Sequence, residues 1–299
     1  MYDILIIGAG PAGISAGIYA MSRGKKTLAL EQAQVGGIIG KVSTVTHYTA
    51  LEPHETGETF AARMKQQALQ AGVEIAYERV TGVELTGDIK TIHTDKRTHQ
   101  AKCVILANGG APRKLGIPGE IELAGKGIGL NAARDGAAYT GKNIYVVGGA
   151  DGAVKEALYL ASFARKLTII HFEDQLGCIA EFRQKVAATP NIALRLTSRL
   201  HGVYGQEYVE RLEIADERSG KVETIEDPGC GVFVYAGISP NTQLYTDLAL
   251  QDGYILTNEK METSIPGVYT AGDIRVKQVR QVATAVADGA IAAIHAALL

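Results

Sequence analysis

The chain has 299 residues, of which 46% are hydrophobic and 21% charged, and its formal net charge is -2. These values are typical of a globular protein with one large or two ordinary domains, and they give no sign of a nucleic-acid-binding surface. No apolar run is long enough to span a membrane, and Met1 leads straight into an apolar strand rather than into a signal peptide.

The first motif joins a predicted strand to a predicted helix. An apolar run at residues 4–7 is typical of a buried parallel strand, and a G-x-G-x-x-G pattern follows it directly. In this pattern Gly8 makes the tight turn, Gly10 lets a pyrophosphate approach the backbone, and Gly13 lets the helix pack closely on the strand. The N-terminus of the helix then offers free N–H groups and a positive dipole end to the anion.

The second predicted strand, residues 27–30, supports a dinucleotide site because it ends at a carboxylate. Glu31 lies about twenty residues beyond the glycines, where an acidic residue bonds a ribose hydroxyl. The alternative is a structural turn followed by a surface glutamate. The order of strand, glycines, helix, strand and carboxylate favours the dinucleotide site.

A flexible loop and a helix come next. Gly36 and Gly37 belong to a glycine-rich loop whose backbone can lie flat against a ring system. His47 follows, and the apolar spacing predicts a helix over residues 58–71.

The following segment is expected to be rich in strands. Val80 begins an alternating strand that ends at residue 85, and residues 90–103 frame a hairpin. A buried strand over 103–107 ends in Asn108 and Gly109. Open α/β sheets bind their ligands at this carboxyl edge.

Beyond a linker marked by Pro112 and Pro118, the first motif partly repeats. The repeat consists, in order, of a strand, a glycine-containing turn, a helix and a second strand (residues 143–147, 148–153, 154–164 and 167–170). Ala150 stands where the close-approach glycine would be, and its methyl group crowds a pyrophosphate. The chain therefore carries two units of the nucleotide-binding type, the second of them degenerate.

Near the C-terminus, residues 267–273 read as a strand, a turn and the carboxylate of Asp273, and an apolar helix is expected over 281–298. Asp273 can bind a ligand, cap a helix, or do both. We expect an α/β protein with two doubly wound Rossmann-like domains, the second inserted in the first. The first would span 1–111 and 245–299, and the degenerate domain would span 112–244.

Together these motifs resemble the low-molecular-weight thioredoxin reductases, which are FAD enzymes of the pyridine-nucleotide disulfide oxidoreductase class. The resemblance extends over essentially the whole chain and rests on residues 8–13, 31, 36–37, 107–109, 237–242, 271–273 and 280–282. It implies a homodimer, FAD as cofactor, and contacts from Asp273 to the ribityl chain and from Gln281 and Val282 to the isoalloxazine. The cofactor-binding residues that it implies are Gly8, Gly10, Pro11, Ala12, Gly13, Glu31, Gly36, Gly37, His47, Val80, Asn108, Gly109, Asp273, Arg280, Gln281 and Val282.

Two small departures concern the flavin surroundings. Ile38 stands where the family usually has glutamine, and His47 stands where it usually has asparagine. These changes alter the polar contacts that the resemblance implies for the flavin, and with them its potential.

A larger departure concerns the redox pair. The family carries C-x-x-C-D-G just before its second nucleotide-binding strand, whereas this chain reads Asn131-Ala132-Ala133-Arg134-Asp135-Gly136. Asp135 and Gly136 fix the register, so both cysteines are replaced. Asparagine and arginine cannot carry out disulfide exchange, which requires a thiolate.

The family's grip on the 2′-phosphate of NADPH is also altered. Phe172 and Glu173 stand where the resemblance leads us to expect arginines. A carboxylate repels a 2′-phosphate but can bond the ribose 2′-OH of NADH, while Ala150 argues against either cofactor. We expect no use of NADPH and leave NADH open.

Three functions fit these observations, and the sequence assigns no catalytic or metal-binding residue. The first is an FAD oxidoreductase that takes electrons from an electron-carrier protein, as ferredoxin-dependent flavin relatives do, although those retain the dithiol. The second is an NADH-dependent flavin oxidoreductase or oxidase, and the third is a non-enzymatic FAD module such as a redox sensor or partner subunit. Arg275, Lys277 and Arg280 lie beside the flavin motif and either dock an acidic protein or are solvated charges.

The 3 cysteines are far apart in sequence, and none lies in a C-x-x-C. This usage indicates a reducing compartment, so we expect a cytoplasmic protein without a disulfide framework or zinc site. Cys103 is expected in the core. Cys178 and Cys230 follow glycines, so the sequence leaves open whether they are exposed and reactive.

Overall fold

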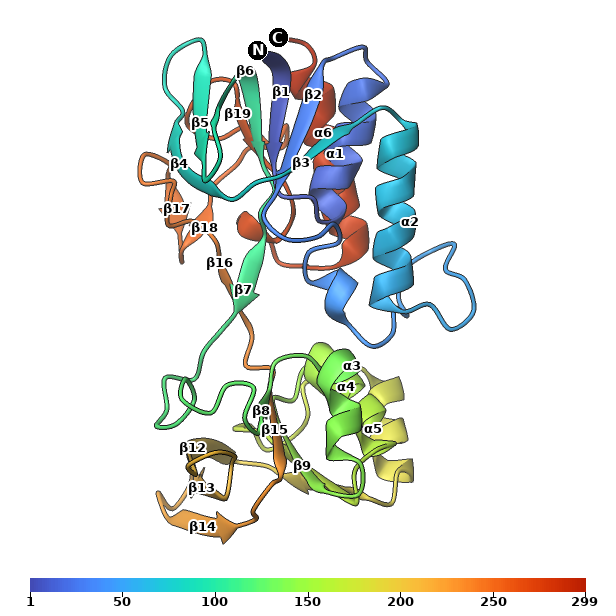
Figure 1. Cartoon of the computed structure of the whole chain (residues 1–299), viewed down its shortest axis with the longest axis vertical. Coiled ribbons are helices and arrows are strands. Elements are labelled where there is room, and N and C mark those ends of the chain that lie inside the picture. Colours follow the sequence, from blue (N-terminus) through green and yellow to red (C-terminus); the bar gives the residue numbers. More distant parts are fainter. The chain divides into compact units, whose positions relative to one another are not determined.

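The structure is a computed structural model that describes residues 1–299, and the chain divides into two compact units. One unit consists of Met1–Ala111 and Ser239–Leu299, and the other of Pro112–Ile238 (Figure 1). We expected the second unit to end at residue 244, but it ends at Ile238. The reason is that Asn241 exchanges hydrogen bonds with Asn108 and donates its N–H to Gly109, which ties this segment to the first unit.

The first unit is built on a seven-stranded sheet. Its strands run in the order β3 (Glu74–Tyr77), β2 (Thr27–Glu31), β1 (Tyr2–Ile7), β6 (Thr98–Leu106), β5 (Lys90–Thr94) and β4 (Val80–Glu84), and β19 (Val268–Thr270) also pairs with β6. The pairs among β3, β2, β1, β6 and β19 are parallel, whereas β4, β5 and β6 form an antiparallel meander.

Helices cover one face of this sheet. Alternate strand residues such as Ile4 and Ile6 pack against α1 (Pro11–Met21), α2 (Gly57–Gln70) and α6 (Val282–Ala296). The opposite face, with Leu5 and Leu28, packs on the meander and on the chain around Tyr245–Ile255. Figure 1 shows α1, α2 and α6 gathered on one side of the strands.

The second unit repeats this plan on a smaller scale. Its parallel sheet has the order β11 (Ile192–Arg195), β10 (Lys166–Ile170), β9 (Asn143–Val147), β15 (Gly231–Val234) and β8 (Ile128–Gly129). One face packs on α3 (Ala132–Asp135), α4 (Asp151–Ala161) and α5 (Ala180–Ala188), and the other on the antiparallel strands β12 (Ser198–Tyr204), β13 (Arg211–Asp216) and β14 (Val222–Glu226). The predicted α/β class with two Rossmann-like sheets is confirmed.

The remaining elements are short. Two two-stranded ladders pair β7 (Gly110–Pro112) with β16 (Ile238–Pro240) and β17 (Leu250–Gln251) with β18 (Tyr254–Ile255). Three 3-10 turns lie at η1 (Ile39–Lys41), η2 (Gly136–Tyr139) and η3 (Gly272–Ile274). No helix combines the length and the apolar character needed to cross a membrane.

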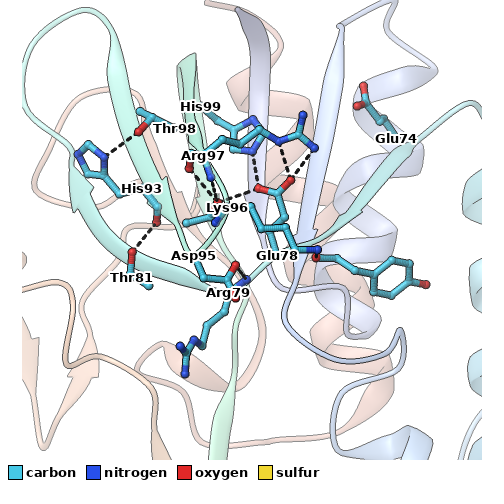
Figure 2. A network of polar contacts seen from close by, with 12 residues as sticks. Glu74, Glu78, Arg79, Thr81, His93, Asp95, Lys96, Arg97, Thr98 and His99 are labelled. Atoms are coloured by element: carbon cyan, nitrogen blue, oxygen red, sulfur yellow. Dashed lines mark hydrogen bonds and ion pairs between the residues drawn. The ribbon is translucent and has the colours of Figure 1, made fainter.

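A buried carboxylate fastens the turn between β3 and β4 to the meander (Figure 2). Glu78 is 3% exposed and accepts hydrogen bonds from His99 Nε2 at 2.8 Å, Arg97 Nε at 2.8 Å and Thr94 Oγ1 at 2.8 Å. Burial by itself would raise the pKa of Glu78, but these donors outweigh burial and lower the pKa to about 2. The backbone N–H of Glu78 also bonds to the carbonyl of Glu31 at 2.9 Å, so the network supports the end of β2.

Candidate functional site

The carboxyl ends of four parallel strands, β2, β1, β6 and β19, meet at one edge of the first sheet. Ile7 pairs with Leu30 on one side and with Leu106 on the other, and Leu106 pairs with Thr270. The chain leaves these strands through the segments that carry Glu31, Gly8, Asn108 and Asp273. The fold therefore brings these predicted site residues, which are distant in sequence, to one edge.

Gly8 and Gly13 are required by the protein itself. Gly8 has a φ of +102°, and a Cβ added there would lie 2.6 Å from the Ala107 carbonyl oxygen. A Cβ on Gly13 would lie 1.9 Å from the Gly8 carbonyl oxygen. These two glycines make the turn and the close packing of α1 on β1, with Pro11 and Ala12 forming the first helical residues.

Gly10 is different, because neither its backbone nor its packing requires a glycine. Its φ of -76° and ψ of -174° suit any residue, and the atoms nearest to an added Cβ are Gly37 Cα at 3.9 Å and Gly36 O at 4.0 Å. Gly36 and Gly37 both have positive φ. An added Cβ at Gly10 would therefore make only ordinary van der Waals contacts, and the room left beside the N-terminus of α1 suits an approaching pyrophosphate.

The carboxylate of Glu31 is held at the end of β2 by backbone donors. Its Oε2 accepts from the Ala9 N–H at 3.0 Å, and its Oε1 accepts from the Ala33 N–H at 2.9 Å. Each carboxylate oxygen can accept more than one hydrogen bond. Glu31 is therefore fixed beside the glycine turn with acceptor capacity left for ribose hydroxyls.

Asp273 lies in the 3-10 turn η3 and carries a buried acceptor without a hydrogen-bond partner. Oδ1 receives no hydrogen bond, and the nearest cation is Lys277 Nζ at 3.7 Å. Burial raises the pKa of the Asp273 carboxyl, although Lys277 and Arg280 oppose this rise. The alternative that Asp273 caps a helix is excluded, because α6 begins after Gln281 and Asp273 makes no cap bond.

The other predicted contacts differ in how free their side chains are. Asn108 is committed to the fold, since its Oδ1 accepts from the Tyr245 hydroxyl at 2.8 Å and its Nδ2 donates to the Asn241 carbonyl at 3.0 Å. His47 is exposed and bonds Thr46 Oγ1 at 3.0 Å. Val80, the first residue of β4, and Gly109, in the segment between β6 and β7, are half-buried.

At the start of α6, the Gln281 N–H bonds Thr284 Oγ1 at 3.2 Å, and Val282 is the first helical residue. The Arg280 guanidinium stacks over the Tyr254 ring at 4.1 Å, and its Nε has no hydrogen bond.

The corresponding edge of the second unit carries different side chains. Ala150 precedes α4, and His171 directly follows β10, where β2 has Glu31. The His171 ring lies against the turn, because a Cβ on Gly149 would be 2.5 Å from it. His171 Nε2 bonds Glu173 Oε2 at 3.0 Å, and the exposed Phe172 ring is stacked by Arg199 at 4.4 Å.

The segment that the resemblance places at the family's redox motif forms a turn held by its own contacts. Asn131 Oδ1 caps α3 by accepting from the Arg134 N–H at 2.9 Å. Arg134 Nε binds Asp135 Oδ1 at 2.6 Å, and Asp135 Oδ2 accepts from the N–H groups of Leu130 and Asn131. Contact with Arg134 lowers the pKa of Asp135 against the effect of burial. Asn131 and Arg134, the two residues that the resemblance places at the cysteine positions, are therefore engaged in local structure.

All three thiols are buried. Cys103, Cys178 and Cys230 are 2%, 3% and 1% exposed, and burial raises the pKa of each. Cys103 lies in the core as expected. Exposure of the other two, which the sequence had left open, is excluded. A thiol with a raised pKa is a poor nucleophile.

The sequence reasoning missed one member of this edge, Asp288 on α6. It is 4% exposed and binds Arg275 and Lys277, so these two cations are neither a docking surface nor solvated charges. The available signal was a lone aspartate within a helix of small apolar residues, which is a costly placement unless the charge is paired.

Residues 2–289 match the family of pyridine nucleotide-disulphide oxidoreductases. The thioredoxin reductase of Peptoclostridium acidaminophilum is 40% identical over 302 residues, covering 99% of this chain and 96% of that protein. The chain belongs to this family. The thioredoxin reductase of Lactococcus lactis in its FR conformation has 36% identity and a TM-score of 0.95, covering 99% of this chain and 98% of the other. A ferredoxin-flavin thioredoxin reductase from Clostridium acetobutylicum has 29% identity and a TM-score of 0.54, covering 99% and 97%.

This thioredoxin reductase-like oxidoreductase has FAD as its cofactor, as the family does. The residues present fit that group. Gly10 leaves room that the protein does not need, and Asp273 Oδ1 lacks a donor that the protein does not supply. Both features lie at the edge where Glu31 is held.

Proposed function

We propose that this flavoprotein moves electrons between FAD and a protein or small-molecule partner, without a redox dithiol of its own and without NADPH. The observation that carries the proposal is the turn at Asn131–Gly136. Its asparagine and arginine stand where the resemblance places the cysteines, and both are held by capping and ion-pair contacts. We expect no other thiol to substitute for them, since all three cysteines are buried and no two of them are close in sequence.

The second unit supports the part of the proposal that concerns NADPH. The Ala150 methyl narrows the approach to the turn, and the His171 ring lies against Gly149. Glu173 brings a half-exposed carboxylate to this edge, where a 2′-phosphate would be repelled.

In the first unit, each residue has a role in holding the cofactor. Gly10 admits the pyrophosphate, Glu31 accepts from ribose hydroxyls, and Asp273 accepts from the ribityl chain. The N-terminus of α6 at Val282 presents its positive dipole end to the flavin ring. Bound FAD supplies both one- and two-electron transfer, which lets such a protein exchange electrons with either kind of partner.

For the partner we propose a reduced electron-carrier protein such as ferredoxin, because a structural relative is named a ferredoxin-flavin thioredoxin reductase and Phe172 and Glu173 stand where the resemblance leads us to expect arginines. The resemblance further supports a homodimer, and the cysteine usage supports a cytoplasmic location. A monomer mass at micromolar concentration would contradict the dimer.

The decisive experiment is anaerobic stopped-flow reduction of the purified flavoprotein by reduced ferredoxin, NADPH and NADH in separate mixings, followed by flavin absorbance. We expect rapid bleaching with ferredoxin and none with NADPH on the same timescale. Rapid bleaching by NADPH would overturn the proposal. Failure of every donor would favour a non-enzymatic FAD module.

A second candidate is an NADH-dependent flavin oxidoreductase. The observation that favours it is the position of Glu173. A Cβ added to Gly177 would lie 3.7 Å from Glu173 Oε2 and 4.0 Å from the Gly149 carbonyl oxygen, so the carboxylate and the glycine turn both lie beside Gly177. A carboxylate at that edge can accept from a ribose 2′-OH. Bleaching by NADH that is lost in Glu173→Ala would establish this candidate.

A further inference from the structure

Asp288 is the centre of a buried ion cluster that encloses the turn carrying Asp273. Its Oδ2 accepts from the Gly272 N–H at 3.1 Å, from Arg275 Nε at 2.9 Å and from Lys277 Nζ at 2.9 Å, and its Oδ1 accepts from Arg275 Nη2 at 2.8 Å. Every donor belongs to residues 272–277. One carboxylate on α6 therefore fixes both ends of a six-residue segment.

The same turn is fixed from its other side by α1. Gly272 has a φ of +81°, and a Cβ added there would lie 2.9 Å from Ala12 Cβ. Ala12 belongs to the glycine motif at the start of α1, and its carbonyl oxygen would lie 2.1 Å from a Cβ on Gly289. Asp273 thus follows a residue that is held between α1, at the glycine motif, and α6.

Lys277 lies between two carboxylates and bonds only one of them. Its Nζ is 2.9 Å from Asp288 Oδ2 but 3.7 Å from Asp273 Oδ1. Asp273 Oδ1 is consequently a buried acceptor without a donor, a state that proteins rarely retain unless a ligand or water completes it. Lys277 Nζ also donates to Thr284 Oγ1 at 3.1 Å, but Asp288 is its only charged hydrogen-bond partner. If Asp288 lost its charge, the neutral bond to Thr284 would compete with the Asp273 carboxylate for Lys277, and Lys277 would move toward this acceptor.

We propose that Asp288 is a positioning residue for FAD: it fixes the turn at residues 272–277 and withholds Lys277, so that the Asp273 carboxylate stays in place and open to the flavin's polyol hydroxyls. This inference rests on the proposed role of Asp273 as a cofactor contact. Asp288 itself acts through Asp273 and need not touch the cofactor.

A double-mutant cycle on the holoprotein tests whether Asp288 acts through Asp273. The FAD dissociation constant and the flavin midpoint potential would be measured for wild type, Asp288→Asn, Asp273→Asn and the double variant. We expect each single variant to weaken FAD binding at least about tenfold, with a shifted potential. The double variant should bind FAD within about threefold of Asp273→Asn alone, because both changes remove one contact.

Glu78→Gln is the matched control, since Glu78 is also a buried carboxylate of this unit, held by Arg97 and His99, and has no hydrogen bond to the turn. The effects of Glu78→Gln and Asp273→Asn on FAD affinity should be independent, so that the fold-changes of the two single variants multiply in the double variant. Arg275→Lys is a milder second variant in case Asp288→Asn does not fold. Lysine keeps the positive charge but cannot form the bidentate contact that Arg275 makes with Asp288. Arg275→Lys should therefore lower FAD affinity about threefold, and should lower it no further in the Asp273→Asn background.

The outcomes separate this inference from the proposed function. Independent, multiplying losses for Asp288→Asn and Asp273→Asn would overturn the positioning role and leave the electron-transfer proposal intact. Unchanged FAD binding by Asp273→Asn would overturn the inference through its premise. The reaction with ferredoxin is tested separately, and its failure would not alter the expected coupling.

Discussion

The two units carry the same turn on the same backbone, with different side chains. The Gly8 N–H bonds the Leu30 carbonyl at 2.8 Å, and the Gly148 N–H bonds the Ile170 carbonyl at 2.9 Å. The third residue of each turn has the same conformation, with φ and ψ of -76° and -174° at Gly10 and of -82° and 172° at Ala150. Any residue can adopt this extended conformation, so the backbone does not require a glycine at either position.

The chemical difference comes from two positions. Gly10 leaves space that no protein atom fills, whereas Ala150 places a methyl group there. Glu31 presents an acceptor at the end of its strand, whereas His171 presents a ring that lies against the turn. We infer that the shared fold carries a ligand site in the first unit and an altered one in the second, because the fold accepts either set of side chains and ligand binding depends on which set is present.

The largest effect is expected from filling the space in the first turn. Gly10→Val should abolish FAD retention, because a branched side chain occupies the pyrophosphate's path while the backbone accepts it. Ala150→Val, the same change at the corresponding position, should leave the flavin content unchanged. The measurement is the flavin-to-protein absorbance ratio after purification. A full complement in Gly10→Val would show that this turn does not hold the pyrophosphate.

The protein should be inactive in the usual thioredoxin reductase reaction, because of the residues that its second unit carries. With NADPH, thioredoxin and a disulfide dye, we expect turnover at least about a hundredfold below that of a thioredoxin reductase assayed alongside. A lost phosphate contact costs about 1.5–3 kcal/mol, and residues 131 and 134 offer no thiol to pass on the electrons. Asn131→Cys/Arg134→Cys should not restore activity, because Ala150 and Glu173 still impair the donor side. Robust wild-type turnover would mean that one of the buried cysteines becomes accessible.

Local sequence signals predicted much of this structure. The strand, glycine turn and helix of the nucleotide-binding motif were placed to within a few residues in each unit, because apolar runs and glycines act over short distances. The helix expected at 58–71 is observed as α2 at Gly57–Gln70, and the last helix as Val282–Ala296. The insertion of one unit within the other followed from the distance in sequence between Gly10 and Asp273.

Tertiary contacts account for what the sequence could not give. Nothing local shows that Lys277 and Arg275 turn inward to Asp288, because the partners are separated by eleven and thirteen residues and by a turn. The burial of Cys178 and Cys230 depends on strands and helices packed from elsewhere. The departure of Asp273 from a capping role depends on where α6 begins, and Gln281 determines that point.

An intermediate effect is expected at the end of β2. Glu31→Gln should weaken FAD binding about tenfold, because the amide nitrogen would face one of the two backbone N–H groups that the carboxylate now accepts. Glu173→Gln, at the corresponding edge of the second unit, should leave FAD affinity unchanged. Titration of the apoprotein with FAD, followed by flavin fluorescence, gives both constants. Equal losses in the two variants would show that the edges do not differ as described.

The smallest effect separates the two units by their response to acid. The pKa of Glu78 is about 2 in the folded protein against an ordinary value of 4.5, so its contribution to the free energy of unfolding is complete above about pH 4.5 and is lost as the pH falls toward 2. Glu78→Gln should therefore cost about 1–3 kcal/mol near neutral pH. The difference in stability between wild type and Glu78→Gln should narrow at about pH 3, where unfolding of wild type would take up the additional proton that binds Glu78.

Glu223→Gln is the counterpart in the second unit. Contact with Arg195 lowers the pKa of Glu223 too, but this carboxylate is 54% exposed, and its loss should change stability by less than about 0.5 kcal/mol at any pH. Urea unfolding followed by flavin release and by circular dichroism, at about pH 7 and about pH 3, measures both variants. A constant gap between Glu78→Gln and wild type at the two pH values would show that the buried network does not hold Glu78 ionised, and the acid response would then have to come from other carboxylates of the first unit, with Asp288 the first to test.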